Sequence, residues 1–340
     1  MKKISIIIPC HNTAQLLPRC MSSLASQTIG IDNMEIILVN DASTDNNATW
    51  QEILHWEAQY PESVIAINLE ENLRQGGARN MGMNYASSEF IGFVDSDDWV
   101  EPNIFELMLD EIVDSGNEIV HCKSFRDNGS HKMPHLLDGS YQRLIIDTED
   151  KRKQFISTNC IGYNVWDKVY RRGFLLENNI IFPEKLMYED ILFSSLCYIY
   201  ASRVSIINYE LYHYFINTES TVLKKNADYH TDILSIINLR ILEYQNRNVW
   251  KPYHDELEFE LLMSGYLSAL KIMFLRYDRV PYDAFLELQK IVKNNNPYCT
   301  ANPYIDKYMP DKYKILMELL VSHVRPEELD EIRKLYLTIK

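Results

Sequence analysis

Short apolar runs alternate with segments of helical spacing along the first 125 residues of the chain, and a cluster of polar residues follows each run. Mainly apolar runs of this length are typical of strands buried on both faces of a parallel sheet. The predicted strands are 3–8, 34–39, 64–68 and 90–94, and the predicted helices between them are 14–27, 50–60 and 76–86. The pattern therefore predicts an α/β fold with a mostly parallel sheet and helices on both faces.

The spacing of apolar and polar positions changes along the rest of the chain. A helix at 102–115 and a strand at 118–125 still continue the α/β alternation. From residue 226 onward the chain shows only amphipathic helical spacing, which predicts a helical C-terminal domain at 226–340. Its predicted helices are 231–246, 255–277, 282–293, 312–321 and 327–340.

The apolar run at 90–94 ends in three carboxylates within four residues, Asp95, Asp97 and Asp98. The carboxyl ends of strands form the ligand-binding edge of open α/β sheets. If the chain stays extended here, Asp95 and Asp97 point to one side and Asp98 to the other. A divalent cation that carries phosphate oxygens suits such a pair, since Mg²⁺ takes one or two protein carboxylates. The alternative is a polar loop in which Asp97 or Asp98 caps the helix near Pro102. We expect Asp98 to be structural and the other two to be functional.

Polar residues that follow the other strands should lie at the same edge. Residues 9–12 follow the first strand, and Asp41 follows the second. Asp41 can accept hydrogen bonds from a base or a ribose, and Arg79 can bind a base or a phosphate. Gly76 and Gly77 would let the backbone approach a ligand closely. An Asx turn at Asp41 and a simple loop at the glycines are the ordinary alternatives. Each of these residues alone favours its ordinary alternative, and only their combination at one sheet edge favours a ligand site.

Composition and charge argue against several classes of binding partner and site. The 340 residues carry a formal net charge of −14, which argues against a nucleic-acid surface or a broad basic membrane patch. The dinucleotide fingerprint and the P-loop are absent. No apolar run reaches the length of a secretion signal or a spanning helix, so we expect a cytoplasmic protein. The six cysteines are too scattered for a zinc site or a disulfide framework, and we interpret them as reduced thiols.

Four motifs in chain order resemble those of the family 2 inverting glycosyltransferases. They are SIIIPCHN at 5–12, VNDAST at 39–44, GGARN at 76–80 and FVDSDDW at 93–99. The resemblance is strong over 1–125 and looser to about 222. It implies the A-type glycosyltransferase fold, a Rossmann-like sheet, and a nucleotide-diphosphate sugar donor, most often a UDP-sugar. It also implies Mg²⁺ or Mn²⁺ at the Asp-x-Asp sequence.

The resemblance divides the catalytic domain, 1–222, into a nucleotide-sugar-binding part at 1–125 and an acceptor side at 126–222. The implied nucleotide-sugar-binding residues are Pro9, His11, Asn12, Asp41, Gly76, Gly77, Arg79, Asp95 and Ser96. The implied metal ligands are Asp95 and Asp97.

Residues 165–172 mix aromatic side chains with mostly basic charges, and their ordinary interpretation is a helix start with solvated arginines. They also resemble a Trp-x-Lys-x-Tyr element on the acceptor side of the family, which makes Trp166 and Lys168 candidate acceptor contacts. His213, among tyrosines, is by itself typical of a packed core histidine, and the resemblance makes it a candidate metal ligand. The chain lacks the Arg that commonly follows this aromatic pair in the family and has Phe215 in that neighbourhood.

Glu189 and Asp190 precede a strongly apolar helical stretch at 191–200. Carboxylates are favoured in the first turn of a helix, which is the structural alternative. Direct displacement at a sugar carbon, however, needs a base that takes the proton from the attacking hydroxyl. In the resembled family an Asp of a Glu-Asp pair has that role. Asp190 is therefore the candidate catalytic base, with Glu189 as its neighbour.

Together these residues predict a metal-dependent inverting glycosyltransferase that acts on a glycan or lipid-linked glycan in surface polysaccharide biosynthesis. The C-terminal helices are a candidate contact with the inner face of the membrane or with a second copy. Two alternatives stay open. One is transfer to a polyprenyl phosphate, an anionic acceptor that needs little base catalysis. The other is a catalytically silent scaffold that binds a sugar nucleotide.

Overall fold

The computed structural model describes residues 2–127, 140–216 and 220–339, and the chain divides into two compact units. The sheet unit consists of Met1–Asp147, Ile161–Lys185 and Tyr200–Asn217. The helical unit consists of Thr148–Cys160, Leu186–Ile199 and Thr218–Lys340. The predicted helical domain at 226–340 lies within the helical unit. That unit also takes in Thr148–Cys160, Leu186–Ile199 and the last few residues of the predicted catalytic domain at 1–222.

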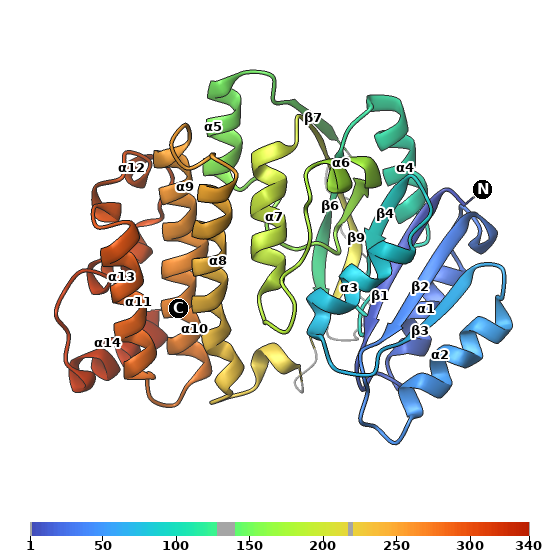
Figure 1. The fold of residues 1–340 in the computed structure, drawn as a ribbon, viewed down its shortest axis with the longest axis horizontal. Helices are drawn as coiled ribbons and strands as arrows, with labels where there is room; N and C mark the ends of the chain where they lie inside the picture. The colour runs from blue at the N-terminus through green and yellow to red at the C-terminus, as the bar shows by residue number, and fades with distance from the viewer. Residues whose placement is uncertain (1, 128–139, 217–219, 340) are drawn as a thin grey trace. The chain divides into compact units, whose positions relative to one another are not determined.

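A nine-stranded mixed sheet forms the core of the sheet unit, as far as the chain is described (Figure 1). Its strand order is β3-β2-β1-β4-β8-β6-β9-β5, and β7 pairs with β9. The strands are β1 (Ile4–Cys10), β2 (Met34–Asn40), β3 (Val64–Asn68), β4 (Phe90–Phe93), β5 (Trp99–Val100), β6 (Ile119–Asp127), β7 (Tyr141–Ile145), β8 (Lys168–Arg171) and β9 (Arg203–Phe215). The four predicted N-terminal strands are thus confirmed, and they pair with one another in parallel.

The other half of the sheet contains antiparallel pairs. Strand β8 lies between β4 and β6 and is antiparallel to both. The expected helix start at 165–172 was therefore wrong, because Val169 and Tyr170 pair with both neighbouring strands. Only the short helix α6 (Arg172–Glu177) follows β8. Strand pairing of this kind depends on residues far away in the sequence, and the local pattern of charges and aromatics does not reveal it.

Helices cover both faces of the parallel half. The helices of the sheet unit, with α6, are α1 (Leu17–Ala25), α2 (Ala48–Gln59), α3 (Arg74–Tyr85), α4 (Ile104–Ser115) and the short η1 (Ile31–Asn33). Alternate residues of β1, Ile4, Ile6 and Ile8, form one core cluster with α1, α2 and α4. Ile7 points to the opposite face, where Gly82 of α3 packs directly against it. The predicted arrangement of helices on both faces is confirmed.

The helical unit is made of the predicted amphipathic helices and two that come from earlier in the chain. Its α-helices are α5 (Glu149–Thr158), α7 (Glu189–Tyr200, with Tyr200 beyond the unit), α8 (Asp232–Asn246), α9 (His254–Glu260), α10 (Leu267–Arg276), α11 (Tyr282–Asn295), α12 (Ile305–Tyr308), α13 (Lys314–Leu319) and α14 (Pro326–Ile339). Short turns lie at η2 (Thr221–Leu223), η3 (Asp228–Thr231), η5 (Cys299–Ala301) and η6 (Asp311–Tyr313). The π-helical turn η4 (Leu261–Tyr266) joins α9 to α10.

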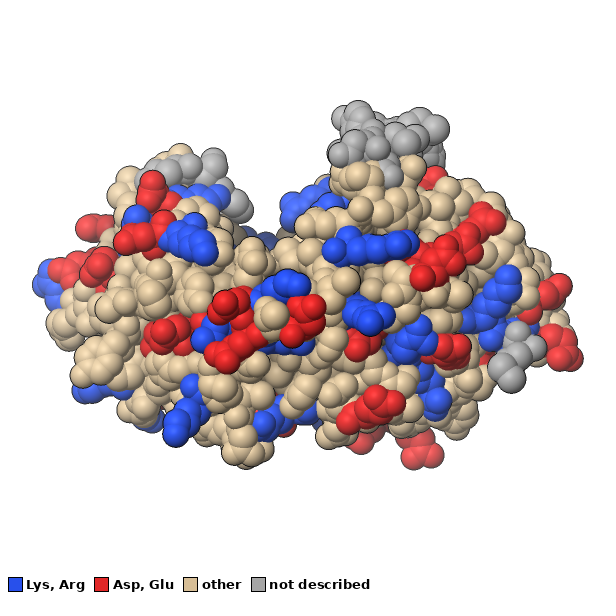
Figure 2. All heavy atoms as spheres, turned by 90° about the horizontal axis from the view of Figure 1, so that it is seen from above, with Lys and Arg blue, Asp and Glu red and all other residues tan. Residues whose placement is uncertain are grey.

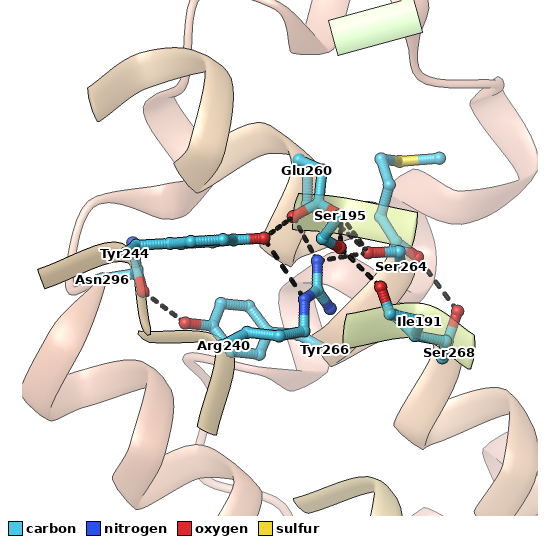
Figure 3. Close-up of polar contacts among 10 residues, drawn as sticks. Ile191, Ser195, Arg240, Tyr244, Glu260, Ser264, Tyr266, Ser268 and Asn296 are labelled. Atoms are coloured by element: carbon cyan, nitrogen blue, oxygen red, sulfur yellow. Dashed lines mark hydrogen bonds and ion pairs between the residues drawn. The ribbon is translucent and has the colours of Figure 1, made fainter. Parts of the chain in front are cut away.

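A buried ion pair lies beside the π-helical turn (Figure 3). Arg240 of α8 is fully buried and pairs with Glu260, the last residue of α9. The same carboxylate accepts hydrogen bonds from the Tyr244 hydroxyl at 2.8 Å and from the Ser195 hydroxyl of α7 at 2.9 Å. Arg240 also donates to Ser264 within the turn, at 2.7 Å. This network, which we call the Arg240 network, therefore joins three helices of the unit through one carboxylate.

The surface carries both signs of charge. Figure 2 shows Lys and Arg side chains interspersed with Asp and Glu side chains on the face that it presents. This mixture agrees, for that face, with the expectation that the protein has no broad basic patch. Among the described helices, none has the length and apolar character that crossing a membrane requires.

Candidate functional site

The three carboxylates after β4 lie on a tight turn. The Asp98 N–H donates to the Asp95 carbonyl at 3.0 Å, so the chain does not continue as an extended strand. Asp98 is buried, and its carboxylate accepts hydrogen bonds from the Tyr212 hydroxyl at 2.8 Å and from the Phe215 N–H at 2.7 Å. Its structural role is therefore confirmed, but it fastens β9 rather than a helix. The predicted cap was wrong, because α4 begins at Ile104 without a side-chain cap.

Asp95 and Asp97 differ in their charge partners. Arg79 of α3 is buried, and its Nη2 lies 2.7 Å from Oδ1 of Asp95. Asp97 is partly exposed, and its pKa is raised to about 6 by burial and by the negative charge of Asp95. Burial, followed by the charges of Asp97 and Asp95, also raises the pKa of Asp98. The turn therefore contains more negative charge than the nearby cations balance.

Arg19 of α1 is a member of this cluster that the sequence analysis missed. Its Nη2 donates to the backbone carbonyl of Asp97 at 2.7 Å. The guanidinium lies 3.8 Å from the ring centroid of Trp99 and 4.2 Å from that of Phe215. Burial lowers the pKa of Arg19, while the charges of Asp98 and Asp97 oppose that effect. In the sequence, Arg19 cannot be told from an ordinary surface arginine of an amphipathic helix, because only the fold brings it to the turn.

His213 lies between two carboxylates. Its Nε2 is 2.6 Å from Oε1 of Glu101, and its Nδ1 is 3.2 Å from Oδ2 of Asp127. The ring also stacks on Trp99, with the centroids 4.9 Å apart. Both ring nitrogens therefore have partners within the protein, and a metal could bind His213 only if one of these contacts opened. Its role as a metal ligand stays a prediction.

The loops that follow β1 and β2 are joined by hydrogen bonds. The side-chain carbonyl of Asn12 accepts from the Thr44 N–H at 2.7 Å, and the backbone N–H of Asn12 donates to the Ser43 hydroxyl at 3.0 Å. Asn12 has a φ of 55°, a left-handed conformation that Asn adopts more readily than most residues. The two strand ends therefore meet at one edge, as the sequence predicted. Pro9 lies in β1, and Ser96 is buried within the carboxylate turn.

Asp41 connects β2 to the start of α3. Its Oδ1 accepts the Leu73 N–H at 2.6 Å, and its backbone carbonyl lies 2.8 Å from Nδ1 of the exposed His11. Burial raises the pKa of the Asp41 carboxyl, and the hydrogen bond from Leu73 opposes that rise. Asp41 therefore holds the first turn of α3 in place. Binding of a nucleoside by Asp41 and His11 stays a prediction.

The paired glycines lie inside α3 rather than in a loop before it. Gly76 and Gly77 are both buried in the first turns of the helix. A Cβ on Gly77 would lie 2.3 Å from Cβ of Leu73, so the helix start has no room for a side chain there. Gly77 is thus required by packing, and an approach of a ligand to these glycines stays a prediction.

Trp166 and Lys168 have partners within the sheet unit. Trp166 stacks on Tyr212 with the centroids 4.3 Å apart, and on Tyr214 at 5.7 Å. Lys168 is buried, and its Nζ lies 2.6 Å from Oδ1 of Asp167. Lys168 is therefore not solvated, whereas Arg171 and Arg172 of the same element are partly exposed. Contact of either residue with an acceptor stays a prediction.

Glu189 and Asp190 lie in the first turn of α7, in the helical unit. Glu189 is 3% exposed, whereas Asp190 is partly exposed. Of the two carboxylates, Asp190 is the more accessible to a substrate. The roles of Asp190 as the base and of Glu189 as its neighbour stay predictions.

The described residues contain no group of three or more His, Cys, Asp or Glu side chains arranged to hold a metal ion. Asp97, with Asp95 beside it, still fits a hard divalent cation, because Mg²⁺ typically takes one or two carboxylates and fills its other positions with phosphate and water. The raised pKa of Asp97 fits the same ion, since a cation would supply the missing positive charge.

Comparison with known proteins agrees with this fold. The structure of Staphylococcus aureus TarS 1–349 superimposes with a TM-score of 0.68 and 22% identity, covering 99% of this chain and 91% of that one. The Escherichia coli K12 glycosyltransferase YibD is 30% identical over 275 residues, which is 76% of this chain and 77% of YibD. The putative glycosyltransferase EpsH of Bacillus subtilis 168 is 29% identical over 274 residues, 78% of this chain and 76% of EpsH.

The fold and these relatives define the protein as a glycosyltransferase with the A-type fold. The model of glycosyl transferase family 2 matches residues 5–175, and the chain belongs to this family.

Proposed function

We propose that this enzyme transfers a sugar from a UDP-sugar, with Mg²⁺ or Mn²⁺, to a hydroxyl of a glycan or glycoconjugate, with inversion at the sugar carbon. The observation that carries this proposal is the carboxylate turn after β4, where Asp97 has a raised pKa beside Asp95. The donor class is supported by the likeness to TarS, which has also been solved with UDP-GlcNAc and with UDP. A more distant structural relative, the mannosyltransferase PcManGT at a TM-score of 0.52, was solved with GDP-Man and Mn²⁺.

In this proposal the ends of β1 and β2 hold the nucleoside, and Arg79 and Asp95 lie toward the ribose and the diphosphate. The positions assigned to the donor are Pro9, His11, Asn12, Asp41, Gly76, Gly77, Arg79, Asp95 and Ser96. The hydrogen bonds between the two strand ends support it, because a preformed edge costs less ordering on binding.

Asp97, together with Asp95, would hold the metal ion. The ion would supply positive charge for the diphosphate that leaves the sugar. Arg19 fixes the turn through the Asp97 carbonyl, so that the Asp97 carboxylate is held in place before the donor arrives. His213 is an additional candidate ligand once one of its carboxylate partners is released.

Asp190 would take the proton from the acceptor hydroxyl, which makes the oxygen a stronger nucleophile at the sugar carbon. Its partial exposure in the first turn of α7 supports this role, and the buried Glu189 is its neighbour in the chain. Trp166 and Lys168 are proposed to shape the acceptor side through their packing within the sheet unit.

The proposed acceptor is a surface polymer or its lipid-linked precursor. TarS is named as a poly(ribitol-phosphate) β-N-acetylglucosaminyltransferase and is 26% identical to this chain over 263 residues, 44% of the length of TarS. GgaB of Bacillus subtilis 168, 32% identical over 160 residues, is named as a minor teichoic acid biosynthesis protein. A polymer of this kind presents hydroxyl groups and would place the enzyme at the cytoplasmic face of the membrane.

A thermal-shift screen tests the donor and metal sites together. Wild type, Asp97→Ala and a control, Asp110→Ala on the exposed face of α4, are heated with UDP-, GDP-, CMP- and dTDP-sugars, each with and without Mn²⁺. A donor at a hundred times its dissociation constant should stabilise wild type and control by about 2.7 kcal/mol. A metal-dependent shift with UDP-sugars that Asp97→Ala loses supports the proposal. A shift in Asp97→Ala equal to that of wild type would rule out the metal assignment.

The type of acceptor is tested with Asp190→Asn. Transfer to a hydroxyl should fall by about 10²–10⁴-fold, because the general base is lost. Retained turnover would favour an acceptor that is already an anion, such as a polyprenyl phosphate. Donor binding should be unchanged in either case.

A further inference from the structure

Tyr188 has an unusual backbone conformation directly before the Glu189–Asp190 pair. Its φ is 68°, in the left-handed region that bulky side chains rarely adopt. Its carbonyl accepts the Ile191 N–H at 3.2 Å, so this residue sets the direction in which α7 begins. Strained residues persist only where surrounding contacts hold them, and they cluster at functional sites.

The contact that holds Tyr188 is a hydrogen bond to a buried histidine. The Tyr188 hydroxyl lies 2.7 Å from Nδ1 of His230, and Nε2 of His230 lies 2.7 Å from the Lys224 carbonyl. A carbonyl only accepts, so Nε2 carries the ring proton, and Nδ1 accepts from the tyrosine hydroxyl. Burial lowers the pKa of His230, which agrees with a neutral ring in this tautomer. The direction of both hydrogen bonds is therefore defined.

A second hydrogen bond holds Met187, the residue before Tyr188. The Met187 N–H donates to Oδ2 of Asp232 at 3.1 Å, at the first residue of α8. Tyr277 also packs its ring edge against His230, with the centroids 6.0 Å apart. Two consecutive residues before Glu189 are thus fastened to the η3–α8 segment of the helical unit. These contacts hold the two residues that lead directly into the first turn of α7.

We infer that Tyr188 and His230 are positioning residues that orient the Asp190 carboxylate for proton transfer. The inference rests on the proposed role of Asp190 as the base. Without the hydroxyl, Tyr188 would leave the left-handed region and the first turn of α7 would rotate. Asp190 would then still be present, but its carboxylate would point in a wrong direction. The pair acts through Asp190 and need not touch the substrate.

The test compares Tyr188→Phe and His230→Leu with a matched control. Tyr229→Phe removes a neighbouring tyrosine hydroxyl, which donates to the Thr221 carbonyl at 2.8 Å, and it keeps the aromatic ring that lies 4.8 Å from the His230 ring. The readouts are hydrolysis of UDP-GlcNAc with Mn²⁺, in which water takes the sugar and UDP is released, the KM for that donor, and amide hydrogen exchange over 187–194. We expect kcat to fall at least tenfold in both variants with the donor KM within twofold of wild type. Exchange at the start of α7 should accelerate, and Tyr229→Phe should match wild type.

Variants in an Asp190→Asn background separate positioning from general destabilisation. If Tyr188 acts through Asp190, Tyr188→Phe should cause no further loss once Asp190 is replaced. An equal further loss in that background, or a kcat unchanged from wild type in Tyr188→Phe, would overturn the inference. Full activity of Asp190→Asn itself would instead show that the proposed base is wrong. The two failures are therefore distinguishable.

Discussion

Arg19 donates to the backbone carbonyl of Asp97 while its guanidinium lies over the ring of Trp99, 3.8 Å from the ring centroid. One side chain of α1 therefore fixes the turn that carries the candidate metal ligand. The planar guanidinium can hydrogen-bond at its edge and stack on its face at the same time. An ammonium group has no such plane, which makes the Arg-to-Lys change informative.

Arg19→Lys should weaken Mn²⁺-dependent donor binding by about tenfold, because the loss of a charge-assisted hydrogen bond and a cation–π contact costs about 1–2 kcal/mol. A titration of UDP-GlcNAc at several Mn²⁺ concentrations measures this effect. Arg143→Lys is the control, since Arg143 pairs with Glu111 at a more exposed place in the same unit. Equal Mn²⁺ dependence in wild type and Arg19→Lys would show that the turn does not need this support.

Asp97→Asn should stabilise the metal-free protein by about 1 kcal/mol at pH 7.5, a value reduced for the partial exposure of the side chain. The folded-state pKa of about 6 lies above the ordinary Asp value of 3.8, so the cost of ionising Asp97 in the fold develops between these two pH values and is complete above about pH 6. The difference should vanish only below about pH 3, where the carboxyl is protonated in both the folded and the unfolded state. Urea denaturation at both pH values measures it. Saturating Mn²⁺ with donor should reverse the order at pH 7.5, and a less stable metal-free variant would contradict the prediction.

Arg79→Met should lower the free energy of unfolding by about 3 kcal/mol, because Asp95 is left without its counter-charge beside Asp97. Adding Asp95→Asn should recover part of this loss. Arg171→Met is the control, since its pair with Glu89 is more exposed and should contribute less than about 1 kcal/mol. Chemical denaturation of wild type, the two single arginine variants and the double variant measures these free energies of unfolding. Equal losses of unfolding free energy in the two single arginine variants would mean that burial of the Arg79–Asp95 pair does not increase its contribution to stability.

Gly82→Ala should destabilise the sheet unit by about 1–3 kcal/mol through overpacking. The new Cβ would lie 2.3 Å from Cγ2 of Ile7 in β1. Ile7→Ala removes that atom, so the double variant should lose less than the sum of the two single changes. Gly173→Ala in α6 is the control, because its Cβ would only reach ordinary contact at 3.7 Å. Additive losses in the double variant would show that the contact with Ile7 is not the cause.

Arg240→Met should destabilise the helical unit by about 3–5 kcal/mol, because the buried Glu260 loses its counter-ion. Arg240→Met with Glu260→Gln should be less destabilising, since no buried charge is left alone. Arg247→Met tests an arginine near the end of the same helix whose pair with Glu243 is less buried, and it should cost under about 1 kcal/mol. Calorimetry of the full chain measures the losses. A double variant that is less stable than Arg240→Met would contradict this account of the Arg240 network.

The sequence by itself determined the local features of this protein. Apolar runs of strand length, each followed by a polar cluster, predicted the four parallel strands, and the strand at 90–94 placed Asp95 and Asp97 at the sheet edge. Four motifs in order indicated the family that the comparisons then showed. These signals depend on neighbours along the chain, and for that reason a single sequence contains them.

Only the tertiary structure decided which distant residues meet. It made residues 168–171 a strand, because β4 and β6 supply partners on both sides. It brought Arg19 to Asp97. It also brought Glu101 and Asp127 to His213. These residues are far apart in the sequence, and no helical or strand spacing relates them. Burial and pairing of charges depend on the three-dimensional neighbourhood rather than on sequence separation. That is the physical reason why these contacts, and the strained Tyr188 beside His230, could not be predicted from the sequence.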